Sequence, residues 1–253
     1  MDKYIRGDFQ DREIYGRITG EAIEILEGPF WLGAGPTGTK VALSEVTLLA
    51  PVQPSKIILV GLNYHRHVQH SQSADKVPDH PLIFMKPPTA IIGPGDNIVY
   101  PDAVDRVDYE AELGVVIGRE GYKISLDNAM DFVFGYTCVN DVTARKLQKI
   151  DGQWTRAKGF NTFCPVGPQV VTGIDASDLS VEAYLNGERR QSGRTSELIF
   201  SIPVLIEFIS SFMTLLPGDL ISTGTPEGID PMERGDTIEV RVEQAGSLIN
   251  KIV

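Results

Sequence analysis

Short apolar segments separated by turn residues run through most of the chain, and they predict a protein built largely from strands. Many of them end in Gly, Asn or Asp, which is typical of strands followed by turns. Because they do not alternate regularly with helical segments, a doubly wound parallel sheet is not expected. We predict an α+β, β-rich fold, a mixed β-roll or sandwich with a few covering helices. The segments are KIILVGLNY (56–64), PLIFMK (81–86), TAIIG (89–93), LGVVIG (113–118), FGYTCVN (134–140), PVGPQVV (165–171), VEAYLNG (181–187), DLISTG (219–224) and TIEVRVE (237–243).

Helical patterns are fewer. Apolar residues at 3–4 spacing predict a helix over 201–216, which ends before Pro217-Gly218, and the segment LDNAMDFVF predicts another over 126–134. A weaker helical pattern covers 142–150. The Gly- and Pro-rich stretch GPFWLGAGPTG (28–38) predicts a loop, and 51–55 predicts a junction between two parts of the chain.

The net charge of −11 argues against a nucleic-acid-binding protein, which would carry a basic surface. An acidic surface also repels anions, so a site for an anionic substrate must supply positive charge locally. Only two cysteines occur, Cys138 and Cys164, which suits a reducing cytoplasm. The polar N-terminus does not resemble a signal peptide, and no apolar run reaches transmembrane length, so we expect a cytoplasmic protein that binds no membrane.

Two glutamates stand at the start of one apolar segment, in DYEAELGVVIG (108–118). Residues two apart on a strand point to the same face, so Glu110 and Glu112 are expected to present neighbouring carboxylates. Carboxylates this close repel each other and lose hydration beside a buried segment. Either the pair lies on a solvated strand edge, or a divalent cation compensates its charge.

A third carboxylate strengthens the metal interpretation. Asp141 follows the strand-like segment FGYTCVN, although an Asp at this position is also a common turn residue or helix N-cap. Three carboxylates without His or Cys form an all-oxygen site, which suits Mg²⁺, Mn²⁺ or Ca²⁺ better than zinc. Incomplete coordination by the protein would leave positions for water and a chelating substrate.

Basic and polar residues near these carboxylates are candidates for binding an anionic substrate. Arg145 follows Asp141 by four residues, one turn if the segment is helical, and Lys158 lies in a Gly- and Asn-containing stretch that predicts a loop. The alternative for both is an ordinary solvated cation. Gly224 and Thr225 belong to a predicted tight turn, which offers backbone N–H groups and a hydroxyl.

All four histidines lie close together, as His65, His67, His70 and His80. His67 and His70 could share a helical face and bind zinc, but the segment lacks a fixed ligand pattern. A polar surface loop is the alternative. We expect the loop over 65–81 to govern substrate specificity, with His65 and His70 as candidate lid residues.

Eight motifs, in order from residue 56 to the C-terminus, resemble those of the fumarylacetoacetate hydrolase family. They are KIILVGLNYxxH, PLIFMKPPTAIIGPGDNI, DYEAELGVVIG, GYTCVNDVTAR, AKGFNTFCPVGP, LNGERRQ, LPGDLISTGTPEG and RGDTIEVRVEQAGSLIN. An ordered set is far more specific than any one motif. The resemblance implies a β-rich roll and a homodimer, with residues 1–53 as a small N-terminal domain and residues 54–253 as the catalytic domain.

The resemblance also implies an enzyme that depends on Mg²⁺ or Mn²⁺ and acts on a small anionic 2-oxo acid, often a dicarboxylate. Its implied mechanism is chelation of the 2-oxo acid, followed by stabilisation of the enolate that forms when a C–C or C–H bond breaks. The implied metal ligands are Glu110, Glu112 and Asp141. The implied substrate-binding residues are Arg145, Lys158, Gly224 and Thr225, and the implied catalytic residues are His67 and Lys158.

The sequence departs from the family pattern at one position. Hydrolytic members read NYxxHxxE, in which a His–Glu pair activates water, whereas here His67 is kept and His70 holds the Glu position. His67 could still act in proton transfer. We therefore expect an isomerase or decarboxylase, of the 2-hydroxyhepta-2,4-diene-1,7-dioate isomerase or oxaloacetate decarboxylase type. The alternatives are a hydrolase of acylpyruvates or fumarylpyruvate, and a metal-binding protein of the same fold without turnover.

Overall fold

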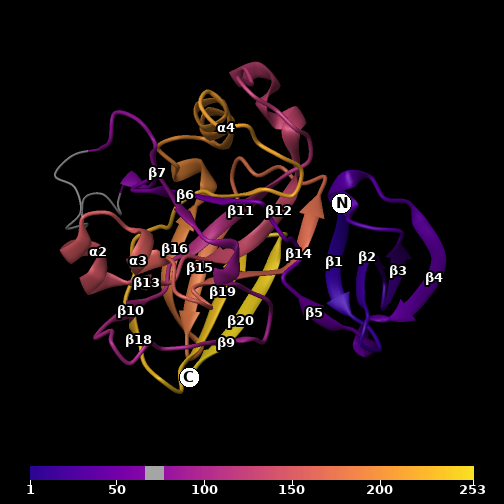
Figure 1. Cartoon of the computed structure of the whole chain (residues 1–253), viewed down its shortest axis with the longest axis horizontal. Helices are drawn as coiled ribbons and strands as arrows, with labels where there is room; N and C mark the ends of the chain where they lie inside the picture. The colour runs from indigo at the N-terminus through magenta and orange to yellow at the C-terminus, as the bar shows by residue number, and fades with distance from the viewer. Residues whose placement is uncertain (66–76) are drawn as a thin grey trace.

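The computed structural model describes residues 1–65 and 77–253, in which twelve strands form one long sheet (Figure 1). The order along it is β4-β3-β2-β1-β14-β12-β11-β17-β6-β7, while β5 pairs with β1 and β8 with β14. Most neighbours are antiparallel, but β6 runs parallel to β17 and β8 to β14. The strands are β1 (Asp2–Asp8), β2 (Glu13–Thr19), β3 (Ala22–Leu26), β4 (Pro36–Ala42), β5 (Thr47–Leu49), β6 (Ile57–Gly61), β7 (Leu82–Lys86), β8 (Ile91–Ile92), β11 (Ala111–Ile117), β12 (Val133–Asn140), β14 (Cys164–Thr172) and β17 (Leu220–Ser222).

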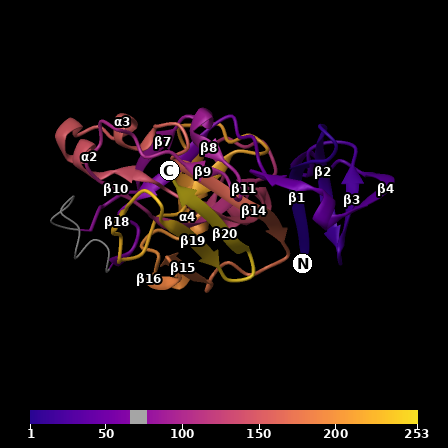
Figure 2. The same cartoon turned by 90° about the horizontal axis from the view of Figure 1, so that it is seen from below.

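The N-terminal strands form a lobe at one side of the molecule (Figures 1 and 2). They nevertheless continue the long sheet, because β1 pairs with β14 from Asp2 opposite Thr172 to Tyr4 opposite Val170. The predicted loop over 28–38 is partly wrong. Phe30–Leu32 forms a 3₁₀ helix, and β4 begins at Pro36.

Burial of aromatic rings explains this difference. Phe30 and Trp31 are 2% and 8% exposed, and their rings pack edge to face with centroids 4.8 Å apart. The Trp31 ring also lies against Gly218 in the larger part of the chain, where an added Cβ would come within 2.6 Å of Nε1. Aromatic packing of this kind outweighs the turn signal of the neighbouring Gly and Pro residues.

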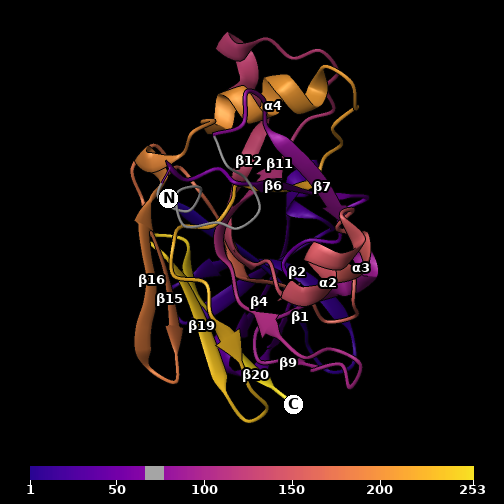
Figure 3. The same cartoon turned by 90° about the vertical axis from the view of Figure 1, so that its left-hand side faces the viewer.

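Two smaller sheets complete the β structure. A five-stranded sheet, β16-β15-β19-β20-β9, packs against β11, β12 and β14 (Figure 3). A three-stranded sheet has the order β13-β10-β18 (Figure 1). The predicted α+β, β-rich fold is therefore confirmed. The strands of these sheets are β9 (Asn97–Ile98), β10 (Val107–Asp108), β13 (Thr143–Ala144), β15 (Ser180–Leu185), β16 (Glu188–Arg194), β18 (Pro231–Met232), β19 (Thr237–Val242) and β20 (Gly246–Ile252).

Strand β11 lies in the middle of the core, and every residue in it is buried. Leu113 and Val115 pack into the apolar cluster shared with the five-stranded sheet, whereas Val116 packs into the cluster on the opposite face. A strand covered on both faces is almost continuously apolar. The polar residues at its start are therefore carried into the interior with it.

Helices are short. Among the described residues, no helix is long and apolar enough to cross a membrane. The α-helices are α2 (Arg145–Asp151), α3 (Thr155–Lys158) and α4 (Ile202–Ser210), and the 3₁₀ helices are η1 (Phe30–Leu32), η2 (Leu43–Glu45), η3 (Pro88–Ala90), η4 (Leu126–Phe132) and η5 (Thr195–Glu197).

The predicted helices form, but with different bounds. The helix expected over 201–216 ends at Ser210, because Leu215 instead exchanges two backbone hydrogen bonds with Gly121, at 2.9 and 3.0 Å. The helix expected over 126–134 is a 3₁₀ helix, and Val133 already belongs to β12. The helix expected over 142–150 begins only at Arg145. In each case tertiary pairing overrides the local periodicity.

Replacing Trp31 with Ala is expected to lower the free energy of unfolding by about 3 kcal/mol, because it leaves a cavity between the N-terminal lobe and Gly218. Leu32→Ala is the matched control: Leu32 is 64% exposed, so its loss should change stability by less than about 0.5 kcal/mol. Urea denaturation measures both values. Equal effects of the two substitutions would contradict the packing described for Trp31.

Candidate metal centre

Two neighbouring strands bring three carboxylates together. Glu110 immediately precedes β11, Glu112 lies on it, and Asp141 immediately follows the paired strand β12. The pairing of Ala111 with Asn140 sets this register, and the Asp141 N–H extends it by donating to the Glu110 carbonyl at 2.9 Å. One oxygen from each carboxylate lies within 4.8 Å of the other two. The register of the β11–β12 pair therefore places the three carboxylates next to one another.

The carboxylates are buried, so the interpretation of a solvated strand edge is wrong. Glu110, Glu112 and Asp141 are 5%, 2% and 0% exposed. Glu112 Oε2 accepts hydrogen bonds from Ser222 Oγ at 2.5 Å and from the Gly224 N–H at 3.0 Å. The end of β17 and the irregular segment that follows it therefore orient this side chain.

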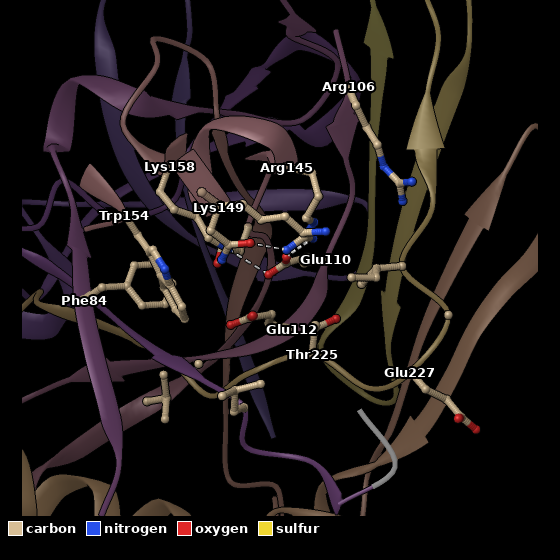
Figure 4. Close-up of a pocket in the computed structure, with 17 residues that line it drawn as sticks. Phe84, Arg106, Glu110, Glu112, Arg145, Lys149, Trp154, Lys158, Thr225 and Glu227 are labelled. Atoms are coloured by element: carbon tan, nitrogen blue, oxygen red, sulfur yellow. Dashed lines mark hydrogen bonds and ion pairs between the residues drawn. The ribbon is translucent and has the colours of Figure 1, made fainter. Parts of the chain in front are cut away.

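Lysine and arginine compensate part of the negative charge (Figure 4). Lys158 Nζ donates to Glu110 Oε2 at 2.9 Å and to Asp141 Oδ2 at 2.5 Å. Arg145 Nη2 donates to Glu110 Oε1 at 2.5 Å, and Thr143 Oγ1 donates to the same oxygen at 3.1 Å. Charge-assisted hydrogen bonds of this kind offset the loss of hydration.

One carboxylate oxygen remains without a donor. Asp141 Oδ1 is buried and accepts no hydrogen bond from the described residues. The Lys86 ammonium lies 2.8 Å away, but its Nζ donates to the carbonyl oxygens of Val142, Lys158 and Phe163 at 2.8, 2.7 and 2.6 Å. A buried acceptor is costly unless something binds it. This oxygen and the all-oxygen ligand set fit Mg²⁺ or Mn²⁺.

Burial and neighbouring charges shift the pKa values of Glu112 and Lys158. Burial, followed by the Asp141 and Glu110 charges, raises the pKa of Glu112 to about 8 from an ordinary value of 4.5. Burial lowers the pKa of Lys158, but the carboxylates of Asp141 and Glu110 outweigh this effect, so its pKa is raised overall. Lys158 therefore stays a cation, whereas the three carboxylates would be stabilised by a bound cation.

A cavity of about 290 Å³ opens over these side chains. The Phe84 and Trp154 rings form an apolar wall, with centroids 5.1 Å apart, and Lys158 Nζ lies 4.9 Å from the centre of the Phe84 ring. Thr225 and Glu227 lie on another side (Figure 4). The cavity thus joins an apolar wall to a strongly charged floor, as small-molecule sites do.

The structure corrects two predictions about basic residues. Lys158 was expected on a loop, but it ends the short helix α3, and the alternative of a solvated cation is wrong because Lys158 is 1% exposed. Arg145 was expected one helical turn after Asp141, but α2 begins at Arg145, and β13 lies between the two residues. From the start of α2 the Arg145 side chain extends to the carboxylates, where it donates a hydrogen bond to Glu110.

Gly224 and Thr225 do not form the predicted tight turn; they lie in an irregular segment directly after β17. Gly224 has a φ of +101°, and an added Cβ would lie 2.9 Å from Asn63 Cβ, so only Gly fits there. The Thr225 hydroxyl lines the cavity, but it also donates to the Ala111 carbonyl at 2.9 Å and accepts from Gln191 Nε2 at 2.8 Å. Thr225 therefore also fixes this segment against β11.

The structure describes only one of the three histidines predicted at the site. His65 is exposed, whereas His67 and His70 lie outside the described residues, as does the zinc site considered for them. Two buried residues that contact the site were not predicted, Lys86 beside Asp141, and Asp108, which accepts a hydrogen bond from Arg145 Nε. Lys86 ends a predicted strand directly before Pro87, and a Lys in an apolar strand is the signal that could have identified it.

Comparisons with known proteins agree with this architecture. Residues 56–253 match the family described as Fumarylacetoacetate (FAA) hydrolase C-terminal, and residues 3–51 match Rv2993c-like, N-terminal. The oxaloacetate tautomerase YisK of Bacillus subtilis is 45% identical over 224 residues, which cover 83% of this chain and 76% of that protein.

Solved structures give the same result. The 2-hydroxyhepta-2,4-diene-1,7-dioate isomerase from Mycobacterium marinum is 42% identical, with a TM-score of 0.93 over 100% of this chain and 98% of that one. A maleylpyruvate hydrolase from Sphingobium is 30% identical, with a TM-score of 0.82 over 99% of each chain. With a family match over residues 56–253, the chain belongs to the fumarylacetoacetate hydrolase family.

Proposed function

We propose that this chain is a Mg²⁺- or Mn²⁺-dependent isomerase or decarboxylase of a 2-oxo or 2-hydroxydienoic dicarboxylate. The observation that carries the proposal is the buried group Glu110, Glu112 and Asp141, with one oxygen lacking a donor and with Lys158 and Arg145 beside it in one cavity. The names of the relatives support the reaction class, since the tautomerase and isomerase are 45% and 42% identical but the hydrolase only 30%.

The proposed metal ligands are Glu110, Glu112 and Asp141, and a divalent ion held there would supply positive charge that polarises a carbonyl group. Tautomerisation and decarboxylation both build negative charge on the 2-oxo oxygen. Arg145 and Lys158 place fixed positive charges at the same end of the cavity, where little water screens them. They would bind the substrate carboxylate and stabilise the developing charge.

Lys158 is also the proposed proton donor. Its ammonium is held by Glu110 and Asp141 and is nearly inaccessible to bulk water, with 1% exposure. The Asp141 and Glu110 charges raise the pKa of Lys158, and an ion that shared those charges would weaken this effect. The proton could then be delivered to the substrate from inside the cavity, while the Phe84 and Trp154 rings restrict water on one side. His67 remains the second candidate for proton transfer, proposed from the sequence alone.

Hydrolysis of a C–C bond is the second candidate function, favoured by the likeness to a maleylpyruvate hydrolase. It requires a water molecule and a residue that activates it, the role that a His–Glu pair has in hydrolytic members. His70 stands in place of that Glu. Isomerisation and decarboxylation need no activated water, which is why we place them first.

The proposal is tested with purified, chelator-treated protein and with added Mg²⁺. We expect it to accelerate enol–keto conversion or decarboxylation of oxaloacetate, or isomerisation of a hydroxydienedioate, in a metal-dependent manner. Cleavage of acylpyruvates without these reactions would favour the hydrolase. Binding of oxalate with Mg²⁺ but no turnover of any of these compounds would identify a non-catalytic metal-binding protein.

Replacing Lys158 with Met keeps the length of the side chain but removes its charge and proton. Turnover is expected to fall at least about 100-fold. Mg²⁺ affinity, measured by calorimetry, should be unchanged or higher because a competing cation has gone. Lys146→Met is the control, since Lys146 is exposed and pairs with Asp105, and its activity should match the wild type. Full activity of the Lys158 variant would exclude this role.

Replacing Glu112 with Gln is expected to stabilise the metal-free protein at alkaline pH. The folded wild type keeps a proton on Glu112 up to about pH 8, whereas the unfolded chain releases it near pH 4.5, so wild-type stability falls as pH rises between these values. The variant lacks this loss. Denaturation with a chelator should show it more stable than wild type by roughly 2–4 kcal/mol at pH 9, with little difference at pH 4.

The metal dependence of the same variant provides the control. Added Mg²⁺ should stabilise the wild type at pH 9 but should have a much smaller effect on Glu112→Gln, because a ligand is missing. A metal-free variant that is less stable than the wild type at pH 9 would contradict the charge repulsion inferred for this site.

A further inference from the structure

Two arginines lie side by side at the edge of the cavity. Strand β10 pairs with β13, with Val107 opposite Ala144, and the Arg145 N–H continues the pairing by donating to the Arg106 carbonyl at 3.1 Å. Both side chains line the cavity. The three-stranded sheet thus holds two guanidinium groups next to each other, an arrangement that needs compensation.

Asp108 supplies the compensation. It is 0% exposed, and its Oδ1 accepts from Arg106 Nε at 2.7 Å. Its Oδ2 accepts from Arg106 Nη2 at 3.1 Å and from Arg145 Nε at 2.8 Å. One buried carboxylate therefore fixes two cations, of which Arg145 is also paired with Glu110.

The two arginines differ in how many of their N–H donors are already used by described residues and in how exposed their side chains are. Arg145 also donates to Glu110 Oε1 and to Gln148 Oε1, at 2.5 and 2.6 Å, and its side chain is only 14% exposed. Arg106 has a side chain that is 41% exposed, and its Nη1 donates to no described residue. Arg106 thus presents unused N–H donors from a fixed position at the cavity. This position lies apart from the triad of carboxylates, Glu110, Glu112 and Asp141 (Figure 4).

The charge of the cavity indicates what these donors would bind. The charged residues among its described lining are four carboxylates, namely Glu110, Glu112, Asp141 and Glu227, and four cations, namely Arg106, Arg145, Lys149 and Lys158. Asp108 and Lys86, which contact these groups from behind, add one charge of each sign. A divalent ion on the triad adds two positive charges. A substrate with two negative charges restores the balance, whereas a monocarboxylate leaves one positive charge in the cavity.

We infer that Arg106 binds the distal carboxylate of the substrate and selects 2-oxo dicarboxylates over 2-oxo monocarboxylates. This inference rests on the proposed function, in which the other end of the substrate binds at the metal. Arg suits the role because its planar fork binds a carboxylate through two N–H groups. Asp108 is then a positioning residue, which fixes the Nε side of Arg106 and leaves Nη1 toward the substrate.

The test uses two ligands of equal length that need not react. 2-Oxoglutarate and 2-oxovalerate share the chelating end and differ in a terminal carboxylate or methyl group, and oxalate has the chelating end alone. Calorimetry with Mg²⁺ should show wild-type protein binding 2-oxoglutarate about 10-fold more tightly than 2-oxovalerate, since a hydrogen-bonded charge pair contributes at this level.

Arg106→Gln should abolish this preference. We expect the substitution to weaken the binding of 2-oxoglutarate about 10-fold, while the affinities for oxalate and 2-oxovalerate change less than about 2-fold. Arg241→Gln is the matched control, because Arg241 makes the same pair of Nε and Nη2 contacts to Glu239, two residues earlier, and is 48% exposed away from the cavity. Arg106→Lys should keep part of the preference.

The outcomes separate this inference from the proposed function. No preference in the wild type, or an Arg106→Gln variant that weakens all three ligands equally or none of them, would overturn the role of Arg106 while leaving the metal site intact. Failure of the wild type to bind oxalate in a Mg²⁺-dependent manner would instead overturn the proposed function. Thermal unfolding of each variant checks that it is folded.

Discussion

Three carboxylates share one small buried volume, and the surrounding structure is organised by the need to compensate their repulsion. Glu110, Glu112 and Asp141 would be unstable there as free anions, because burial removes water and their charges act on one another through a medium that screens poorly. Lys158 and Arg145 meet part of this charge. The raised pKa of Glu112, and the oxygen of Asp141 that lies near Lys86 but accepts no hydrogen bond from the described residues, mark the part that a divalent ion would meet.

The fold supplies the positions of these charges from several directions. The β11–β12 register places Glu110 beside Asp141, and β17 with the segment that follows it orients Glu112. Lys86, at the end of β7, donates to three carbonyls around the site and so fixes the backbone that carries Asp141 and Lys158. No one element makes the site, which explains why its residues come from motifs spread along the sequence.

The sequence predicted the parts of this arrangement that depend on pattern. Period-2 spacing placed Glu110 and Glu112 on one face, and the ordered motifs implied that Asp141, Arg145 and Lys158 belong with them. Lys86, Asp108 and Arg106 were not predicted, because their significance lies in contacts between segments distant along the chain.

Local pattern was least reliable where packing between distant segments decides the backbone. Phe30 and Trp31 adopt a buried 3₁₀ turn because they have an aromatic cluster and Gly218 to pack against, and Leu215 leaves the helical pattern to pair with Gly121. A single sequence shows neither partner. The same limit applies to Lys158, whose burial depends on carboxylates from two other segments.

The central claim is that the three carboxylates form a site for a divalent ion. Anomalous diffraction from crystals grown with Mn²⁺ tests it directly. We expect a strong anomalous peak about 2 Å from an oxygen of each of Glu110, Glu112 and Asp141. A structure of the Mn²⁺-treated crystals without a peak there, with the three carboxylates in contact with lysine and arginine alone, would contradict it.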